Sequence, residues 1–324
     1  MLELETLPTT VLTGFLGSGK TTLLRRALRS PALSDTAVII NEIGEIAIDH
    51  HLVDFVEGSV LELPGGCLCC AVREDLARTL RTLLERRHSG EIKRFRRVVI
   101  ETTGLADPAP ILFTLGADTI LDHSLHLARV VTLVDAVNGA ENLDRFTEAV
   151  RQAALADALV ISKTDLATLG PDLAHRLDVV NDRAERILAA ETEDVGLVLF
   201  GDKRSAAPAM PTEPAVAHTH GIDAFGVVLE GSISRLEFAR ALGGLARERG
   251  TDLLRVKGIV RFADRPERPA VVQAAQHSMF APEWLDDWPD GDQRSRLVFI
   301  VHEIPRSDIL AHFAFAAPAL WHSS

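Results

Sequence analysis

One segment limits the fold of this chain more than any other: the run GFLGSGKTT at residues 14–22. It matches G-x-x-x-x-G-K-[ST], in which glycines let backbone N–H groups turn inward around phosphate oxygens. A β-rich run precedes it and a strong helix former follows it, so a helix N-terminus would add partial positive charge. This strand–loop–helix context argues against a chance match in a Gly-rich turn. The sequence therefore predicts a phosphate-binding loop.

Two side chains of this loop have roles that follow from their chemistry. Lys20 would place a point charge beside the β- and γ-phosphates, which makes it a candidate catalytic residue. The Thr21 hydroxyl would ligate Mg²⁺. We expect the nucleotide phosphates to be bound by Gly14, Gly17, Ser18, Gly19, Lys20, Thr21 and Thr22.

A second segment, Ser162-Lys163-Thr164-Asp165, follows a predicted strand and indicates which base is bound. The Asp165 carboxylate can accept both N1–H and N2–H of guanine, whereas adenine has no such pair of donors. The aliphatic stem of Lys163 can lie against the base. GTPases usually carry Asn at the first position, so Ser162 is expected to make one polar contact fewer. The alternative is a plain exposed turn rich in charge.

A third segment, Glu101-Thr102-Thr103-Gly104, ends another predicted buried strand. A carboxylate at such a strand end can hold the Mg²⁺ shell or orient a water molecule, so Glu101 is a candidate catalytic residue. Gly104 would let the backbone approach the γ-phosphate. The alternative is simply a strand that ends in a turn.

All three cysteines of the chain lie within four residues, at Cys67, Cys69 and Cys70. Thiolates with this spacing cannot share one face of a regular helix, but they could converge in the Gly-rich turn predicted before a helix near Glu74. A position close to a helix start favours the thiolate form. Three ligands leave one position open, which suits a transferable metal. Zn²⁺ fits soft thiolates, with Co²⁺ or Cu(I) as alternatives; three inert buried cysteines are the other interpretation.

An acidic segment with two histidines follows the second predicted strand, from Asn41 to Glu45 and on to Asp49, His50 and His51. In this class of fold such a region often becomes a switch that the γ-phosphate orders. Glu42 could reach either Mg²⁺ or a thiolate-bound metal, so it is a candidate catalytic residue and metal ligand. His50 and His51 are more simply solvated loop residues. His218 and His220 further on could capture metal transiently, but they are more simply residues of a linker.

Apolar runs alternate with helical stretches in the first half, which predicts an α/β domain with a mostly parallel sheet. Domains are expected at 1–201 and 222–324, with a Pro- and Ala-rich linker at 202–221, and the second domain is expected to be a smaller α+β domain. The expected strands are Thr9–Thr13, Ala37–Asn41, Arg97–Thr102, Arg129–Asp135, Ala158–Ser162, Ala224–Leu229, Leu253–Phe262, Ala270–Ala275 and Arg296–His302. The expected helices are Lys20–Arg29, Glu74–Arg87, Arg235–Arg249 with a capping box of Ser234 and Glu237, and Ser307–Ala314.

Charge and hydropathy exclude two classes of partner. The net charge of −12 argues against nucleic acid. No apolar run approaches the roughly 20 residues of a membrane helix. The acidic start of the chain lacks a signal-peptide pattern, so a cytoplasmic location is expected.

Five segments occur in one order: GFLGSGKTT, NEIGEIAIDH, GGCLCC, ETTGLADP and SKTD. Together they resemble the CobW-type metallochaperone GTPases, relatives of the urease and hydrogenase accessory GTPases, and LLRVKGIVRF resembles the second module of that family. The resemblance implies hydrolysis of GTP, for which Mg²⁺ is the expected cofactor. It also implies binding of Zn²⁺ or Co²⁺ at Cys67, Cys69 and Cys70, and transfer of that metal ion to a client metalloprotein. It also allows a homodimer. The rival interpretations are a metal-sensing protein without delivery and a P-loop kinase for a small molecule.

Overall fold

The computed structural model of the chain divides into two compact units, one of residues 1–176 with 184–201 and one of residues 177–183 with 202–324. Each unit is described by itself. The structure describes residues 6–30, 33–41, 60–62, 69–192, 194–201, 221–289 and 292–321.

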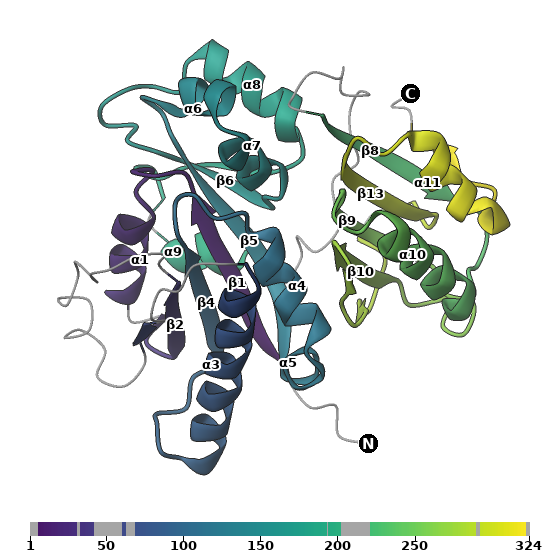
Figure 1. Cartoon of the computed structure of the whole chain (residues 1–324), viewed down its shortest axis with the longest axis horizontal. Helices are drawn as coiled ribbons and strands as arrows, with labels where there is room; N and C mark the ends of the chain where they lie inside the picture. The colour runs from purple at the N-terminus through teal and green to yellow at the C-terminus, as the bar shows by residue number, and fades with distance from the viewer. Residues whose placement is uncertain are drawn as a thin grey trace. The chain divides into compact units, whose positions relative to one another are not determined.

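The first unit is built on a parallel sheet of seven described strands in the order β3-β2-β4-β1-β5-β6-β7 (Figure 1). Every strand pairing in it is parallel. The central strands are buried on both faces, which explains their continuous apolar sequences. The strands are β1 (Leu7–Gly14), β2 (Thr36–Asn41), β3 (Val60–Glu62), β4 (Arg97–Thr102), β5 (Leu125–Asp135), β6 (Ala158–Ser162) and β7 (Glu185–Leu188).

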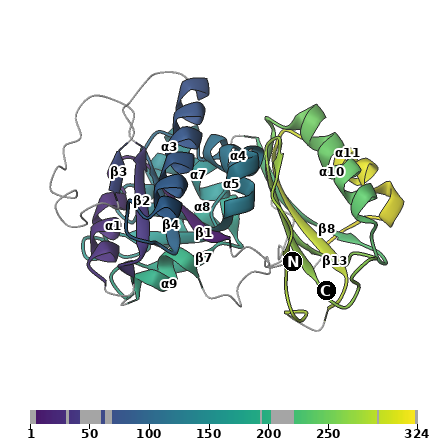
Figure 2. The ribbon, with the colours of Figure 1, turned by 90° about the horizontal axis from the view of Figure 1, so that it is seen from below.

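Helices cover both faces of this sheet, as expected for an α/β fold (Figure 2). Apolar side chains of α1 and α9 form one core with alternate residues of the central strands. Thr132 of β5 points to the opposite face, where its hydroxyl donates to a backbone carbonyl of α7. The helices are α1 (Lys20–Leu28), α3 (Cys69–Ser89), α4 (Ala109–Ala117), α5 (Thr119–Ser124), α6 (Gly139–Arg145), α7 (Thr147–Ala154), α8 (Pro171–Asn181) and α9 (Val195–Phe200).

The predicted fold class is confirmed, and the five strands predicted for this half are present with small shifts at their ends. No strand of this half is predicted after Ser162, so β7, which pairs with β6, was missed. The side chains of β7 are exposed or half-buried, so this edge strand lacks the apolar run of a central strand. Helix α3 begins at Cys69, five residues before the predicted start at Glu74.

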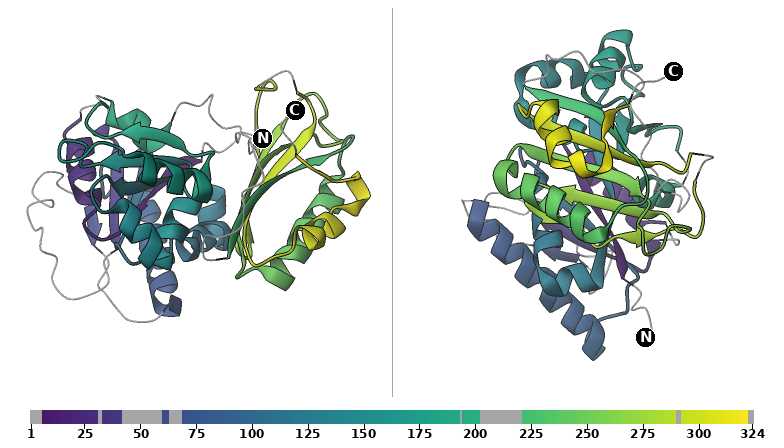
Figure 3. Two further views of the ribbon diagram at one scale, coloured as in Figure 1. Left: turned by 90° about the horizontal axis from the view of Figure 1, so that it is seen from above. Right: turned by 90° about the vertical axis from the view of Figure 1, so that its right-hand side faces the viewer.

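The second unit contains an antiparallel sheet in the order β11-β10-β9-β13-β8-β14, with β12 paired to β10 (Figure 3). Helices α10 and α11 lie along one face of it. The elements are β8 (Ile222–Leu229), α10 (Arg235–Arg249), β9 (Leu253–Val260), β10 (Ala270–Ala275), β11 (Ser278–Met279), β12 (Glu283–Trp284), β13 (Ser295–His302), α11 (Arg306–His312), a 3₁₀ turn (Ala314–Ala316) and β14 (Ala319–Leu320).

The core of the second unit forms between this sheet and its two helices. The Phe238 ring of α10 meets the Phe262 ring edge-on at 5.6 Å and packs against Phe313. Ser234 occupies the predicted N-cap position, but its side chain makes no capping hydrogen bond, so the predicted capping box is wrong. Burial of the apolar face of α10 stabilises the helix instead.

The predicted linker spans residues 202–221, and all of it except Gly221 lies outside the described residues, so the domain limits stay a prediction. None of the described helices is both long enough and apolar enough to cross a membrane.

Candidate nucleotide site

Four functional segments follow four neighbouring strands. The strands β4, β1, β5 and β6 are adjacent in the sheet and parallel, so their carboxyl ends meet at one edge. The chain continues from β1 into the glycine-rich loop, from β4 into the segment of Gly104, from β5 past Asp135, and from β6 into Lys163. Open parallel sheets bind ligands at this edge, beside the strand where the connections change direction.

The glycine-rich loop turns sharply between β1 and α1, and its glycines are required by its geometry. Gly14 has φ of +142° and Gly19 has φ of +94°, conformations that other residues rarely adopt. A Cβ on Gly14 would lie 2.6 Å from the Leu133 carbonyl oxygen. Helix α1 starts after Gly19 without a side-chain cap, so its first N–H groups point into the loop. This arrangement can accept the oxygens of a phosphate.

Lys20 lies in the same loop and is almost fully buried, with 9% of its surface exposed. Its ammonium donates to the carbonyl oxygens of Gly14 at 2.7 Å and of Phe15 at 3.3 Å. These bonds hold the charge over the loop that would receive the phosphates. The predicted position of Lys20 as a phosphate-binding residue therefore agrees with the geometry.

Thr21 and Glu101 come together although they are far apart in the sequence. The Thr21 hydroxyl donates to Glu101 Oε1 at 3.1 Å, and Glu101 is 4% exposed at the end of β4. Register places Glu101 beside Leu12 of β1, so the carboxylate cannot move far from the loop. A hydroxyl and a carboxylate are hard oxygen ligands, and this donor set fits Mg²⁺.

The segment after β4 also touches the loop directly. A Cβ on Gly104 would lie 2.7 Å from both the N and Cα atoms of Leu16. Only glycine allows this close approach of two backbones. Gly104 therefore lies directly against the phosphate loop, and its predicted approach to the γ-phosphate stays a prediction.

Ser162 connects the β6 segment to the same loop. Its hydroxyl donates to the Ser18 carbonyl oxygen at 2.6 Å. Ser162 is expected to make one polar contact fewer than asparagine would make, and in the structure its hydroxyl is bonded to the loop backbone. The residues predicted to recognise the base and those predicted to bind the phosphates are thus directly joined.

Sequence reasoning missed Asp135, which is 4% exposed at the end of β5. Its Oδ2 accepts hydrogen bonds from Lys163 Nζ at 2.5 Å and from Asn138 Nδ2 at 3.1 Å, and its Oδ1 accepts from the Val137 N–H at 2.7 Å. Burial raises the pKa of Asp135, but the hydrogen bonds from Lys163, Val137 and Asn138 outweigh it and hold the pKa below its ordinary value. The signal in the sequence was an Asp-x-x-Asn turn directly after a buried strand.

This ion pair fixes Lys163, whose φ is +56°. Asp165 follows in the same turn and is exposed at the sheet edge. Lys163 is therefore tied to Asp135 at the end of β5, whereas Asp165 is exposed, and recognition of guanine by Asp165 stays a prediction.

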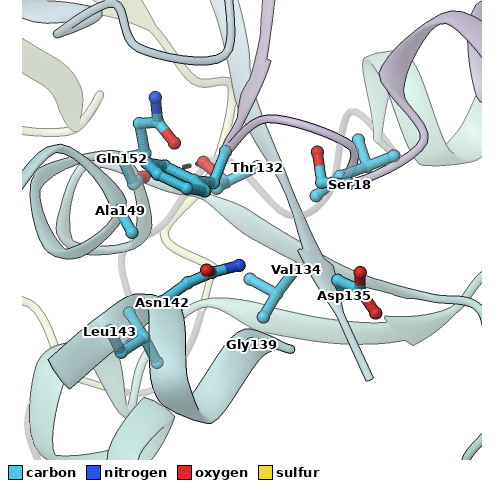
Figure 4. Close-up of a pocket in the computed structure, with 11 residues that line it drawn as sticks. Ser18, Thr132, Val134, Asp135, Gly139, Asn142, Leu143, Ala149 and Gln152 are labelled. Carbon is cyan, nitrogen blue, oxygen red and sulfur yellow. Dashed lines mark hydrogen bonds between the residues drawn. The ribbon is translucent and has the colours of Figure 1, made fainter. Parts of the chain in front are cut away.

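A small pocket lies beside the loop, between β5 and the helices α6 and α7 (Figure 4). Its lining is largely apolar and includes Phe15, Val134, Leu143 and Ala149. It contains none of the residues predicted to hold Mg²⁺ or to read the base. Ser18, which is predicted to bind phosphate, lines the pocket together with Phe15 of the same loop, so the pocket adjoins the predicted phosphate site.

The predicted metal site falls mostly outside the described residues. Glu42, Cys67, His50, His51, His218 and His220 are not among them. Cys69 and Cys70 form the first turn of α3, so the prediction that they lie in a turn before the helix is wrong. A regular helix separates consecutive residues by about 100°. Within the described part of the chain, no group of three His, Cys, Asp or Glu side chains could hold a metal ion.

The parallel sheet and the glycine-rich loop define a P-loop nucleotide-binding protein. The chain belongs to the CobW/HypB/UreG family: residues 8–189 match the nucleotide-binding domain of that family. Residues 222–317 match the cobalamin synthesis protein cobW C-terminal domain.

Similar proteins span nearly the whole chain. The zinc chaperone YjiA of Escherichia coli is 34% identical over 311 residues, covering 94% of this chain and 97% of YjiA. The zinc chaperone CobW of a Sinorhizobium species is 30% identical and covers 94% of this chain and 96% of its own length. The crystal structure of Zn(II)-bound YjiA GTPase from E. coli superposes with a TM-score of 0.66 at 30% identity, over 96% of this chain and 99% of that one.

Proposed function

We propose that this protein hydrolyses GTP to GDP and phosphate and uses that cycle to deliver Zn²⁺, with Co²⁺ as the alternative cargo, to a client metalloprotein. The observation that carries the proposal is the gathering of Lys20, Thr21, Glu101 and Ser162 around one glycine-rich loop. Membership of a family with relatives named zinc chaperones supports the metal cargo.

Each residue of the site has a task in this reaction. The loop N–H groups and Lys20 bind the phosphates, while Thr21 and Glu101 would hold Mg²⁺. Bound Mg²⁺ would neutralise charge that develops on the phosphate oxygens. Asp165 would accept the two N–H groups of guanine, and Gly104 would bring the backbone to the γ-phosphate. Glu42 is the second candidate for the metal shell.

The cargo site would be formed by Cys67, Cys69 and Cys70, with Glu42 as a further ligand. Two described elements flank this segment: β2 ends at Asn41, which pairs with Thr102 next to Glu101 on β4, and α3 begins at Cys69. A γ-phosphate that orders the segment after β2 would therefore alter the metal site. Each tenfold change in metal affinity needs only about 1.4 kcal/mol, which a reordered segment can supply.

The coupling is tested by measuring Zn²⁺ affinity with GDP and with a non-hydrolysable GTP analogue. Tighter Zn²⁺ binding with the analogue is expected, and equal affinities would exclude coupling. Lys20→Ala should abolish nucleotide binding and keep Zn²⁺ binding. Cys69→Ala should abolish Zn²⁺ binding and keep nucleotide binding.

The base is tested by competition between GTP and ATP. GTP should bind at least tenfold more tightly. Asp165→Asn should reduce that preference and improve binding of XTP, because the xanthine C2 carbonyl accepts from an amide and is repelled by a carboxylate. Preference for ATP, with transfer to a small-molecule acceptor, would favour the kinase interpretation. Zn²⁺ binding without transfer to any client would favour a sensor.

A further inference from the structure

Helix α7 contacts the loop after β4 through two adjacent side chains. Gln152 Nε2 donates to the carbonyl oxygens of Gly104 at 3.1 Å and Ala106 at 2.9 Å. Arg151 Nη1 donates to Asp107 Oδ2 at 2.9 Å. This segment, residues 104–107, is called the Gly104 loop below.

The orientation of the Gln152 side-chain amide follows from the chemistry of its hydrogen-bond partners. Both partners are carbonyl oxygens, which only accept, so the amide nitrogen must face them. Gln152 is fully buried, and its Oε1 has no hydrogen-bond partner within the described residues. A buried amide is costly to retain unless its bonds matter to the structure or the site.

The same helix also contacts the phosphate loop. The ring of Phe146, at the N-cap of α7, stacks on that of Phe15 with centroids 4.6 Å apart. The backbone carbonyl of Gln152 accepts a hydrogen bond from Thr132 of β5 at 2.7 Å, shown dashed in Figure 4. Helix α7 is thus fixed to the sheet and touches both the phosphate loop and the Gly104 loop.

Gln152 also controls the direction of the peptide that follows Gly104. Peptide units are planar, and their C=O and N–H bonds point in opposite directions. The Gly104 carbonyl points to Gln152, so the Leu105 N–H faces away from α7. Gly104 itself lies against the backbone of Leu16 in the phosphate loop.

We propose that Gln152, assisted by Arg151, is a positioning residue that holds the Gly104 loop ready to bind the γ-phosphate. This inference rests on the proposed function. GDP has no γ-phosphate, so the Gly104 loop contributes to the binding of GTP and not to that of GDP. Loss of the Gln152 amide should therefore weaken GTP selectively.

The test compares Gln152→Met with the unaltered protein. Methionine keeps the size of the side chain and removes its donors. Affinities for GDP and for a non-hydrolysable GTP analogue are measured by calorimetry with Mg²⁺ present. The ratio of analogue to GDP affinity is expected to fall about tenfold. The same substitution at Gln273, a partly buried residue of β10 in the second unit, should leave the ratio unchanged.

The outcomes separate the two proposals. Failure of the unaltered protein to bind either nucleotide would refute the proposed function. Equal loss of both affinities in Gln152→Met, or no loss, would refute the positioning role, since a purely structural defect does not distinguish the nucleotides. Should Gln152→Met not fold, Arg151→Met provides the test. Arg151 is 31% exposed, and its removal must lower the same ratio for the proposal to stand.

Discussion

The Ser162 hydroxyl donates a 2.6 Å hydrogen bond to the Ser18 carbonyl oxygen, a contact between residues 144 positions apart. It joins the turn that would recognise the base to the loop that would bind the phosphates. The two halves of the nucleotide site therefore share one buried polar link.

Ser162→Ala should weaken GDP binding about tenfold. The Ser18 residue is 1% exposed, so its carbonyl would lose this partner without full access to water, at a cost of about 1–3 kcal/mol. Calorimetric titration with GDP measures the effect. Ser89→Ala, at the exposed end of α3, is the matched control and should bind GDP normally. Unchanged affinity in Ser162→Ala would show that the link does not support the site.

In the unaltered protein, Mg²⁺ should raise the affinity for a GTP analogue. Thr21→Ala and Glu101→Gln should each reduce that gain in affinity by about tenfold or more, because each removes a hard oxygen ligand of the ion. The measurement is GTP-analogue affinity across a Mg²⁺ titration, with EDTA as the zero point. Affinity in EDTA should change little. Thr119→Ala, an exposed threonine of α5, is the control. A normal Mg²⁺ response in both site variants would contradict this assignment.

Gly14→Ala should destabilise the protein more than Gly17→Ala. Both residues have positive φ, +142° and +71°, but a Cβ on Gly14 meets the Leu133 carbonyl oxygen at 2.6 Å whereas one on Gly17 meets nothing within 4 Å. Strain alone should cost Gly17→Ala about 1 kcal/mol. Gly14→Ala should lose at least about 2 kcal/mol, since the backbone must also shift. Urea unfolding compares the two, and equal losses would contradict the clash.

Asp135→Asn should lower stability at neutral pH, and the loss should disappear in acid. The folded-state pKa of Asp135 lies below its ordinary value, so the ionised carboxylate stabilises the folded protein at pH values above about 3.9. That contribution falls as the pH drops through the lower, folded-state pKa. Melting temperatures of both proteins at pH 7, 5, 4 and 3 provide the measurement. The difference in melting temperature between the two proteins should be constant between pH 7 and 5 and shrink below about pH 4. A difference that grows in acid would show that the folded protein does not favour the ionised form of Asp135.

Much of the fold followed from local patterns. The strands Arg97–Thr102, Ala158–Ser162 and Ala270–Ala275 and the helix Arg235–Arg249 were predicted with their observed limits, because each has a strong apolar period or run. The edge strand Glu185–Leu188 was missed. A strand at a sheet edge is paired on one side only and needs no apolar run, so its place depends on its neighbour in the sheet.

The nucleotide residues were found because their chemistry depends on spacing along the chain. The loop of Gly14 to Thr22 contains its glycines, lysine and threonine in one continuous segment, and its signal is local. Asp135 and Gln152 were not found, because their roles exist only through residues on other elements. Asp135 forms its ion pair with Lys163, which directly follows β6, and Gln152 donates to the carbonyl oxygens of Gly104 and Ala106.

Hydrophobic periodicity and motif spacing are properties of the chain, so the amino-acid sequence was sufficient to predict the fold class and the phosphate loop. Tertiary structure decided which of these segments meet: parallel pairing of β4, β1, β5 and β6 brings their carboxyl ends to one edge. Long-range contacts such as Thr21 with Glu101 and Ser162 with Ser18 depend on that strand order. No local pattern encodes it, because the order of strands results from packing of the whole sheet.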